Sequence, residues 1–392
     1  MRIVGYIWGE DPHGYLNIFE YSKYTHLIYC QLAVTSATNP TLVYGAGNSS
    51  NLAAVKAKAQ AAGCKLSICL IGGDWFPPDY LGPIMNNSTY RAQLVTNLVN
   101  FVAANGLDGV DIDLETGSSI QASYSAFLSA LRSALPAGKI ISVCGTAEWA
   151  NPSNQWFSVS AVNTYVDFVN LMMYDVRPFP ESSKLADIQT YTQEWLNAGF
   201  TPAKLNLGIP AFGYAPAGGL GDYSQIIANI NPANNTNSTT ATTPWTTSPA
   251  EYWWSGYNLN QSKVQYAQSK NLGGIMIYAA NEDACGNAKS VISAVSSMLS
   301  SGFTAGSVHT VSFQVTVAPT NQSCQVEVYL GVNQTTKAAT SGLVSFTSTG
   351  SSQALVVTVT MPAAGTYNTY IDLYMLGVKI KSFTGTTTLT VT

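Results

Sequence analysis

Three carboxylates spaced two residues apart are the part of this sequence best suited to chemistry. Asp111, Asp113 and Glu115 alternate with valine, isoleucine and leucine in one strand-like run, 108–115. Because side chains alternate between the two faces of a strand, the three acids share one face. The neighbouring runs are almost wholly apolar, so we expect this strand to be central and its acids buried. Buried carboxylates are costly unless they are paired, hydrogen-bonded or protonated, and protonated ones serve as general acids.

Two other interpretations compete with a catalytic one. The acids would also fit a structural cluster or a solvated edge strand, but an exposed edge would not need the apolar alternate face. They would also fit a metal site, but metal-binding barrels usually draw their ligands from several strands rather than from one. We therefore expect a catalytic carboxylate site with no metal ion and no cofactor.

The elements that must position these acids follow from the hydrophobic pattern of residues 1–305. Apolar strand-like runs alternate there with helical patterns, and they predict strands at 3–8, 27–34, 66–71, 108–115, 140–144, 166–174, 205–210 and 274–278. Helices are predicted at 51–62, 90–104, 123–135, 185–197, 261–269 and 288–299. Eight such units predict a (β/α)8 TIM barrel, whose functional residues lie at the C-terminal ends of its strands. Glu115 closes the fourth strand, as this rule requires.

The connection between the last two barrel strands is unusually long. This insertion, 215–271, holds a polar tract at 231–243 and then an aromatic cluster of Trp245, Tyr252, Trp253, Trp254 and Tyr257. A loop of this length in a compact domain is usually functional or a small inserted unit. The aromatic cluster is either a small core that anchors the insertion or a wall of the substrate cleft.

The pattern changes after residue 305. Short runs in 306–392 alternate strictly between apolar and polar residues, which predicts a small all-β, immunoglobulin-like sandwich of antiparallel strands. Tyr329 falls on the polar-facing register, which predicts that it is exposed. All eight tryptophans precede residue 255, so we favour a spacer or stabilising domain over a module that binds crystalline polymers.

Composition narrows the class of partner. Only 10% of residues are charged, and the formal net charge is −4, so nothing points to nucleic acid or an anionic membrane surface. No apolar run reaches the roughly 18 residues of a membrane helix. Met1 leads into a strand-like run, as in the mature part of an exported protein or in a cytoplasmic one. Low charge with abundant Ser, Thr, Asn and Tyr favours a secreted, extracellular protein that acts on a neutral polymer. We expect it to be a monomer.

The cysteines match no zinc-binding spacing. Cys30, Cys69 and Cys144 fall inside apolar strands, where we expect small buried hydrophobes. A bridge between Cys285 and Cys324 is the one disulfide considered.

The acidic run resembles the signature of glycoside hydrolase family 18, which comprises chitinases and related endo-β-N-acetylglucosaminidases. Residues 108–115 match its DGxDxDxE motif in full. The resemblance extends to about residue 300 and includes Gly5-Tyr6, residues 25–29, Gly72-Gly73, residues 172–175 and residues 273–276. It does not cover the sandwich.

Three positions depart from the family pattern. Leu70 replaces a serine that would donate to Asp111, although Tyr29 is expected to remain within reach. Tyr278 replaces the tryptophan that floors the reacting subsite, and Tyr214 replaces a substrate-binding arginine. These changes bear on subsite affinity more than on the reaction class.

The resemblance implies a reaction in which the substrate's own 2-acetamido oxygen attacks the anomeric carbon. Glu115 would protonate the leaving oxygen and later activate water. Asp113 would hold the acetamido N–H and share a proton with Asp111. Tyr174 would donate to the acetamido oxygen, and Asp175 would bind the distorted sugar.

Chitin or another N-acetylglucosamine polysaccharide is the partner that these features favour. Substrate-binding side chains are expected among Asp175, Tyr278, Tyr6, Trp149, Tyr214 and Tyr29. We therefore expect a retaining endo-hydrolase of β-1,4-linked N-acetylglucosamine polymers. The alternatives are an endo-β-N-acetylglucosaminidase acting on N-glycans or peptidoglycan, and a non-catalytic chitin-binding lectin.

Overall fold

The structure is a computed structural model, and it describes residues 1–11, 14–45, 49–74, 76–174, 183–214, 220–229, 239–243, 250–299, 306 and 308–391. The chain divides into two compact units, Met1–Met298 and Leu299–Thr392. The predicted boundary after residue 305 adjoins a segment, 300–305, outside the described residues.

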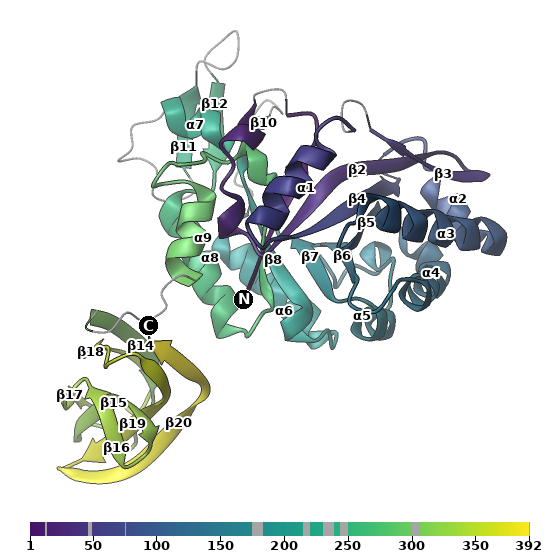
Figure 1. Cartoon of the computed structure of the whole chain (residues 1–392). Coiled ribbons are helices and arrows are strands. Elements are labelled where there is room, and N and C mark those ends of the chain that lie inside the picture. The colour runs from purple at the N-terminus through teal and green to yellow at the C-terminus, as the bar shows by residue number, and fades with distance from the viewer. Residues whose placement is uncertain are drawn as a thin grey trace. The chain divides into compact units, whose positions relative to one another are not determined.

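The first unit is a closed barrel of eight parallel strands surrounded by helices (Figure 1). Its strands are β1 (Arg2–Trp8), β2 (His26–Ser36), β4 (Lys65–Gly73), β5 (Gly109–Glu115), β6 (Ile140–Thr146), β7 (Phe168–Met172), β8 (Leu205–Pro210) and β13 (Gly274–Tyr278). Pairing of β1 with both β13 and β2 closes the ring. All eight predicted strands are therefore confirmed.

The helices pack their apolar faces on the barrel. They are α1 (Leu52–Ala61), α2 (Leu81–Asn86), α3 (Ser88–Asn105), α4 (Gln121–Ala134), α5 (Val159–Tyr165), α6 (Leu185–Asn197), α8 (Tyr257–Ser269) and α9 (Val291–Leu299). The Asn87 side chain caps α3 by accepting from the amides of Thr89 and Tyr90, and Gly106 ends that helix with φ of 59°. The short helices α2 and α5 were not predicted. None of the described helices is both long and apolar enough to cross a bilayer.

Antiparallel strands extend the barrel at two places. β3 (Asn39–Tyr44) pairs with the end of β2. The region around the predicted insertion forms a second sheet in the order β10-β9-β12-β11, made by β9 (Phe212–Tyr214), β10 (Leu220–Asp222), β11 (Thr239–Thr243) and β12 (Ala250–Trp254), with α7 (Tyr223–Asn229) following β10.

The aromatic cluster of the insertion contributes at least one side chain to a small core. Trp254 is 2% exposed, and an added Cβ at Gly213 would lie 2.6 Å from Ile226 and 3.3 Å from Trp254. Gly213 thus lets the strand approach these two side chains closely. Trp245 lies outside the described residues.

The second unit is an all-β sandwich of antiparallel sheets. Its strands are β14 (Val308–Val315), β15 (Ser323–Asn333), β16 (Thr336–Thr340), β17 (Val344–Thr347), β18 (Gln353–Thr360), β19 (Gly365–Met375) and β20 (Val378–Val391). One sheet pairs β14 with β18, and the other runs β16-β15-β19-β20 with β17 on β15. Val326 and Val328 of β15 meet Val357 and Val359 of β18 in the core between them.

The prediction that Tyr329 is exposed is wrong. Its side chain has no exposed surface and stacks on Tyr370 with ring centroids 5.2 Å apart. The Lys337 ammonium lies 4.6 Å from the centre of the Tyr329 ring. Covered in this way, Tyr329 cannot serve as a flat platform for a polymer.

Candidate active site

The three carboxylates of β5 lie on one face of a central barrel strand, in order of increasing exposure. Asp111 has no exposed surface, Asp113 is 9% exposed and Glu115 is half-buried. In the parallel ladder with β4 they lie beside Cys69, Ile71 and Gly73 respectively. The series therefore runs from the barrel interior to its C-terminal rim, where barrel enzymes place their chemistry.

A glycine is required beside the last of these acids. Gly73 has φ of 114°, and an added Cβ would lie 2.2 Å from the Glu115 carbonyl oxygen. Both the backbone conformation and the close approach exclude a larger residue. The end of β4 can therefore run directly against the backbone of Glu115.

Asp111 is held by four donors inside the barrel, one of which is the Cys144 thiol, whose Sγ lies 3.8 Å from Oδ2. Tyr6 Oη donates to its Oδ2 at 2.8 Å, and Ser142 Oγ donates to its Oδ1 at 2.5 Å. Asn170 Nδ2 lies 3.4 Å from the same Oδ1. Burial raises the pKa of Asp111 to about 6, and the hydrogen bonds from Ser142 and Tyr6 limit that rise.

A polar chain continues from Asp111 across the barrel. Asn170 Nδ2 also donates to Tyr6 Oη at 2.9 Å, and Asn206 Nδ2 donates to Asn170 Oδ1 at 2.9 Å. Arg2 Nε in turn donates to Asn206 Oδ1 at 3.1 Å. Each buried amide thus has partners on both sides, which fixes the donors that hold Asp111.

Asp113 is the acid with an uncommitted oxygen. Among the described residues, its buried Oδ1 has no hydrogen-bond partner. Burial, followed by the charges of Glu115 and Asp111, raises the pKa of Asp113 well above its usual range. Asp113 therefore keeps its proton to a higher pH than an ordinary aspartate and presents an oxygen to a ligand.

Aromatic rings gather at the same end of the barrel. Tyr278, the last residue of β13, stacks on Tyr174 with centroids 5.9 Å apart. It meets the edges of Tyr6 and Trp8 at 5.8 and 6.3 Å. The sequence-predicted Tyr6, Tyr174 and Tyr278 are thereby brought together with the carboxylates. Tyr214 joins the edge of the group, packed against Phe212 at 5.3 Å.

Two predicted site residues lie elsewhere. The prediction that Tyr29 reaches Asp111 is wrong, because its neighbours Ile28 and Cys30 fill the inner cluster and Tyr29 projects from the opposite face of β2. The prediction that Trp149 binds sugar is also wrong. Trp149 is 6% exposed and is enclosed by Phe157, Trp195 and Phe200 at 5.5, 4.5 and 4.7 Å.

Other predicted features have simpler outcomes. Asp175 lies outside the described residues. All six cysteines are free, so the bridge considered between Cys285 and Cys324 is not formed. Cys144 is buried as expected, yet its thiol also contacts Tyr6 Oη at 2.9 Å.

Sequence reasoning missed the side chains that support Asp111. Ser142, Asn170 and Asn206 are each a polar residue within the apolar run of a buried parallel strand. A polar residue in such a run needs a buried partner, and that requirement was an available signal. Leu70 pairs with Ile112 on the outer face, so a serine at that position would not reach Asp111, and the expectation of a donor there is wrong. Ser142 of β6 donates to Asp111 instead.

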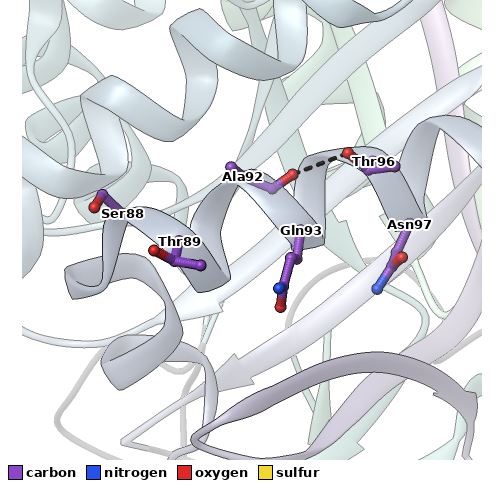
Figure 2. Close-up of a pocket in the computed structure, with 6 residues that line it drawn as sticks. All are labelled: Ser88, Thr89, Ala92, Gln93, Thr96 and Asn97. Carbon is purple, nitrogen blue, oxygen red and sulfur yellow. Dashed lines mark hydrogen bonds between the residues drawn. The ribbon is translucent and has the colours of Figure 1, made fainter.

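Of two cavities in the barrel unit, one lies beside the candidate site and the other lies away from it. One of about 340 Å³ lies at the ends of β1 and β13 and is lined by Trp8, Glu10, Asp11, Tyr15, Asp222, Asn281 and Glu282. Another of about 540 Å³ lies against α3, and none of the described residues that line it is titratable (Figure 2). Only the first adjoins the aromatic group. The described residues contain no cluster of His, Cys, Asp and Glu arranged to hold a metal ion.

Several known proteins have sequences similar to this chain. A class V chitinase of Arabidopsis thaliana is 27% identical over 311 residues, which is 67% of this chain and 81% of that protein. A chitinase-like effector of Moniliophthora perniciosa is 27% identical over 225 residues. The chain spans about half the length of that effector, 51%, and the match covers 50% of the chain.

A solved structure agrees with the fold. The chitinase ChiB from the chitin utilization locus of Flavobacterium johnsoniae superposes with a TM-score of 0.64 at 24% identity, covering 76% of this chain and 93% of that one. The family model for glycosyl hydrolases family 18 matches residues 2–283, which span the whole of the acidic strand and all eight barrel strands. This chain belongs to glycosyl hydrolases family 18.

Proposed function

We propose that the protein is a secreted, monomeric, retaining endo-hydrolase of β-1,4-linked N-acetylglucosamine polymers, with chitin as its substrate. The observation that carries this proposal is the graded carboxylate series of β5. Asp111 is fully hydrogen-bonded, Asp113 has a raised pKa and an oxygen without a partner, and Glu115 lies at the rim. In such a series Asp111 can take up a proton, Asp113 can accept a hydrogen bond from a substrate N–H, and Glu115 can act as the general acid at the bond that breaks.

Glu115 acts first as a general acid and then as a general base. Glu115 donates its proton to the glycosidic oxygen, and the C1–O bond breaks as the acetamido oxygen attacks C1. Asp113 passes its proton to Asp111, accepts a hydrogen bond from the acetamido N–H and, as a carboxylate, supports the positive charge of the resulting oxazolinium ion, while Tyr174 donates to the acetamido oxygen. Glu115 then takes a proton from water, which attacks C1 from the face that the leaving group vacated. Two displacements retain the anomeric configuration.

The aromatic rings supply a surface suited to the sugar. Tyr278 lies between Tyr174 and Trp8 at the ends of β13 and β1. Aromatic faces favour the C–H faces of a pyranose ring. We assign Tyr278 to the floor of the reacting subsite and Trp8 to a neighbouring one.

Replacement of the acid tests this assignment directly. Glu115→Gln should bind the hexamer of N-acetylglucosamine but lose at least the roughly 10²–10⁴-fold that a general acid contributes. Products of the wild-type enzyme should first appear as the β anomer. More than about a tenth of wild-type activity in the variant, or initial α product, would contradict the mechanism.

Substrate variants separate the alternatives. Cellulose and fully deacetylated chitosan oligomers lack the acetamido nucleophile and should not be cleaved. Cleavage of high-mannose N-glycans or peptidoglycan in preference to chitin oligomers would instead identify an endo-β-N-acetylglucosaminidase. Tight binding of chitin oligomers without turnover would identify a non-catalytic lectin, a possibility raised by the relative named a chitinase-like effector.

A further inference from the structure

Lys263 of α8 is a fully buried lysine that the proposed reaction does not use. Its side chain has no exposed surface, and no described carboxylate lies within ion-pair distance. Its Nζ donates to Ser183 Oγ at 2.9 Å and to Ser255 Oγ at 2.7 Å. Burial lowers the pKa of Lys263 to about 7. An apolar side chain would fill this space without the desolvation cost, so the buried amine points to a role in holding its hydrogen-bond partners in position.

The amine is connected to the end of β7 through one hydroxyl. Ser183 Oγ accepts from Lys263 and donates to the Met173 carbonyl oxygen at 2.6 Å. Ser183 is itself fully buried and has φ of 65°, in the left-handed region that a serine rarely adopts. Such strain persists where the surroundings over-determine a conformation, and here two hydrogen bonds hold the side chain.

Met173 needs this support because the barrel ladder stops before it. Pairing of β7 with β8 ends at Leu171, and pairing with β6 ends at Met172. Tyr174 follows Met173 directly and lies two residues beyond Met172, the last ladder position. The bond from Ser183 therefore acts on the peptide group that joins Met173 to Tyr174.

We propose that Lys263 is a positioning residue for Tyr174. Through Ser183 it fixes the Met173 carbonyl, and this sets the direction in which the Tyr174 ring enters the aromatic group at the barrel mouth. The inference rests on the proposed function in that Tyr174 is taken to donate to the acetamido oxygen.

A double-mutant cycle tests this link. Lys263→Met keeps the volume and removes the donor, and it should lower kcat on the N-acetylglucosamine hexamer about 10–100-fold, as loss of positioning does, with KM changed less than about threefold. In a Tyr174→Phe background the same substitution should cost less than about threefold, because the group it positions is already gone. Additive losses, or an unchanged kcat for Lys263→Met, would overturn the proposal.

Two further variants separate positioning from a general loss of structure. Ser183→Gly removes the connecting hydroxyl while suiting the positive φ, and it should reproduce the kcat loss without adding to Lys263→Met. Asn260→Ala is the matched control. Asn260 is a fully buried residue of the same helix, and its Nδ2 donates to the Ser255 carbonyl at 2.9 Å. This variant should change kcat less than about twofold, since it touches Ser255 and not Ser183.

Amide hydrogen exchange gives a readout that does not depend on turnover. Lys263→Met and Ser183→Gly should speed exchange at Met173 and Tyr174, and Asn260→Ala should not. If the wild type cleaves no N-acetylglucosamine polymer, the proposed function fails while this exchange pattern still decides the link from Lys263 to Tyr174. Unchanged exchange at Met173 and Tyr174 in both variants would show that Lys263 only anchors α8.

Discussion

Buried carboxylates occur on strands of both units, and they differ in what surrounds them. In the barrel, neutral side chains donate to Asp111, and Asp113 lies near the like charges of Glu115 and Asp111. The described residues place no lysine or arginine in an ion pair with either acid. In the sandwich, Glu327 of β15 is 8% exposed and Asp372 of β19 is 1% exposed. The two sets are alike in being buried acids on strands, so their hydrogen-bonding and charged partners must account for their different pKa values and roles.

The sandwich supplies each of its acids with a cation and a hydroxyl. Glu327 accepts from Lys337 Nζ at 2.6 Å and Thr340 Oγ1 at 2.7 Å. Burial alone would raise the pKa of Glu327, but the hydrogen bonds from Lys337 and Thr340 and the Lys337 charge outweigh it, and the pKa is lowered. Asp372 accepts from Lys379 and from Ser382 Oγ at 3.2 and 2.6 Å.

The difference shows which buried acid marks a reaction site. An acid with a cation beside it is ionised and satisfied, and it serves the fold. An acid without one keeps its proton to higher pH and has capacity for a ligand, as Asp113 does. Substitutions of matched acids in the two units should therefore give opposite losses.

Among the comparisons between the two units, the largest effect is expected from this matched pair of acids. Asp113→Asn should lower kcat on the N-acetylglucosamine hexamer about 10²–10³-fold, because an amide cannot support the charge of the oxazolinium ion. Its melting temperature should not fall, since a neutral amide carries no desolvation cost. Asp372→Asn should leave kcat within about twofold but lower the melting temperature of the sandwich.

Kinetics and calorimetry on the two variants check this contrast. Retention of more than about a tenth of the activity by Asp113→Asn would remove Asp113 from the mechanism. A loss of turnover in Asp372→Asn would mean that the paired acids of the sandwich are not purely structural.

A smaller effect is expected from the stacked tyrosines of each unit. Tyr278→Ala should raise KM about tenfold by removing the floor of the subsite, whereas Tyr278→Trp should be tolerated because indole offers more stacking area. Tyr329→Ala, the matched change in the sandwich stack, should leave KM unchanged and lower the stability of that unit. Equal KM values for Tyr278→Ala and the wild type would show that sugar does not stack there.

The barrel was predictable because each of its strands can be recognised from its own local sequence. Continuous apolar runs mark buried parallel strands, and period two places Asp111, Asp113 and Glu115 on one face without any knowledge of neighbours. The face that Tyr29 occupies was not predictable in this way, because residues 27–30 of β2 are all apolar and buried and show no alternation around Tyr29.

The supports of the site depend on contacts between distant residues. Ser142 and Asn170 reach Asp111 only because β6 and β7 follow β5 around the ring. Trp149 follows a strand just as a sugar-binding residue would, and only the packing of Trp195 and Phe200 shows that it is core. The alternation of β15 correctly predicts the face on which Tyr329 lies. It cannot predict that Tyr370 and Lys337 cover the Tyr329 ring, because these residues come from other strands.

The two units should respond to pH in opposite directions. In the barrel, burial raises the pKa of Asp111 and of Asp283 to about 6, and burial with the Asp222 charge raises that of Glu282 to about 8. The folded barrel thus holds protons that the unfolded chain has released, so its stability falls as the pH rises from about 4 to about 8. Glu327 has a lowered pKa, so its contribution to the sandwich is lost as the pH falls below about 4.5.

Calorimetry of the whole chain measures both transitions. Burial lowers the pKa of His26 to about 4 and that of Lys263 to about 7. These two groups make the barrel more stable as the pH rises, which opposes the effect of the acids with raised pKa values, but the acids outnumber them. From about pH 8 to about pH 5 the barrel transition should move up, and below about pH 4.5 the sandwich transition should move down. Asp111→Asn should reduce the shift of the barrel. Parallel shifts of the two transitions would contradict the contrast between unpaired and paired acids.

The smallest effect is expected from removing the sandwich. Each unit has its own core, and Tyr329 and Tyr370, at 0% and 5% exposed, do not form an exposed aromatic platform. Residues 1–305 alone should therefore fold and cleave soluble N-acetylglucosamine oligomers within about twofold of the full chain, with a loss below about tenfold on insoluble chitin. Rates of residues 1–305 and of the full chain on soluble and insoluble substrate check this, with melting curves to show that the barrel is folded. A loss of about a hundredfold confined to insoluble chitin would make the sandwich a binding module that contacts the polymer through a surface other than that of Tyr329 and Tyr370. Failure of residues 1–305 to fold would show that the barrel depends on the sandwich for its core, which the separate clusters of buried side chains in the two units argue against.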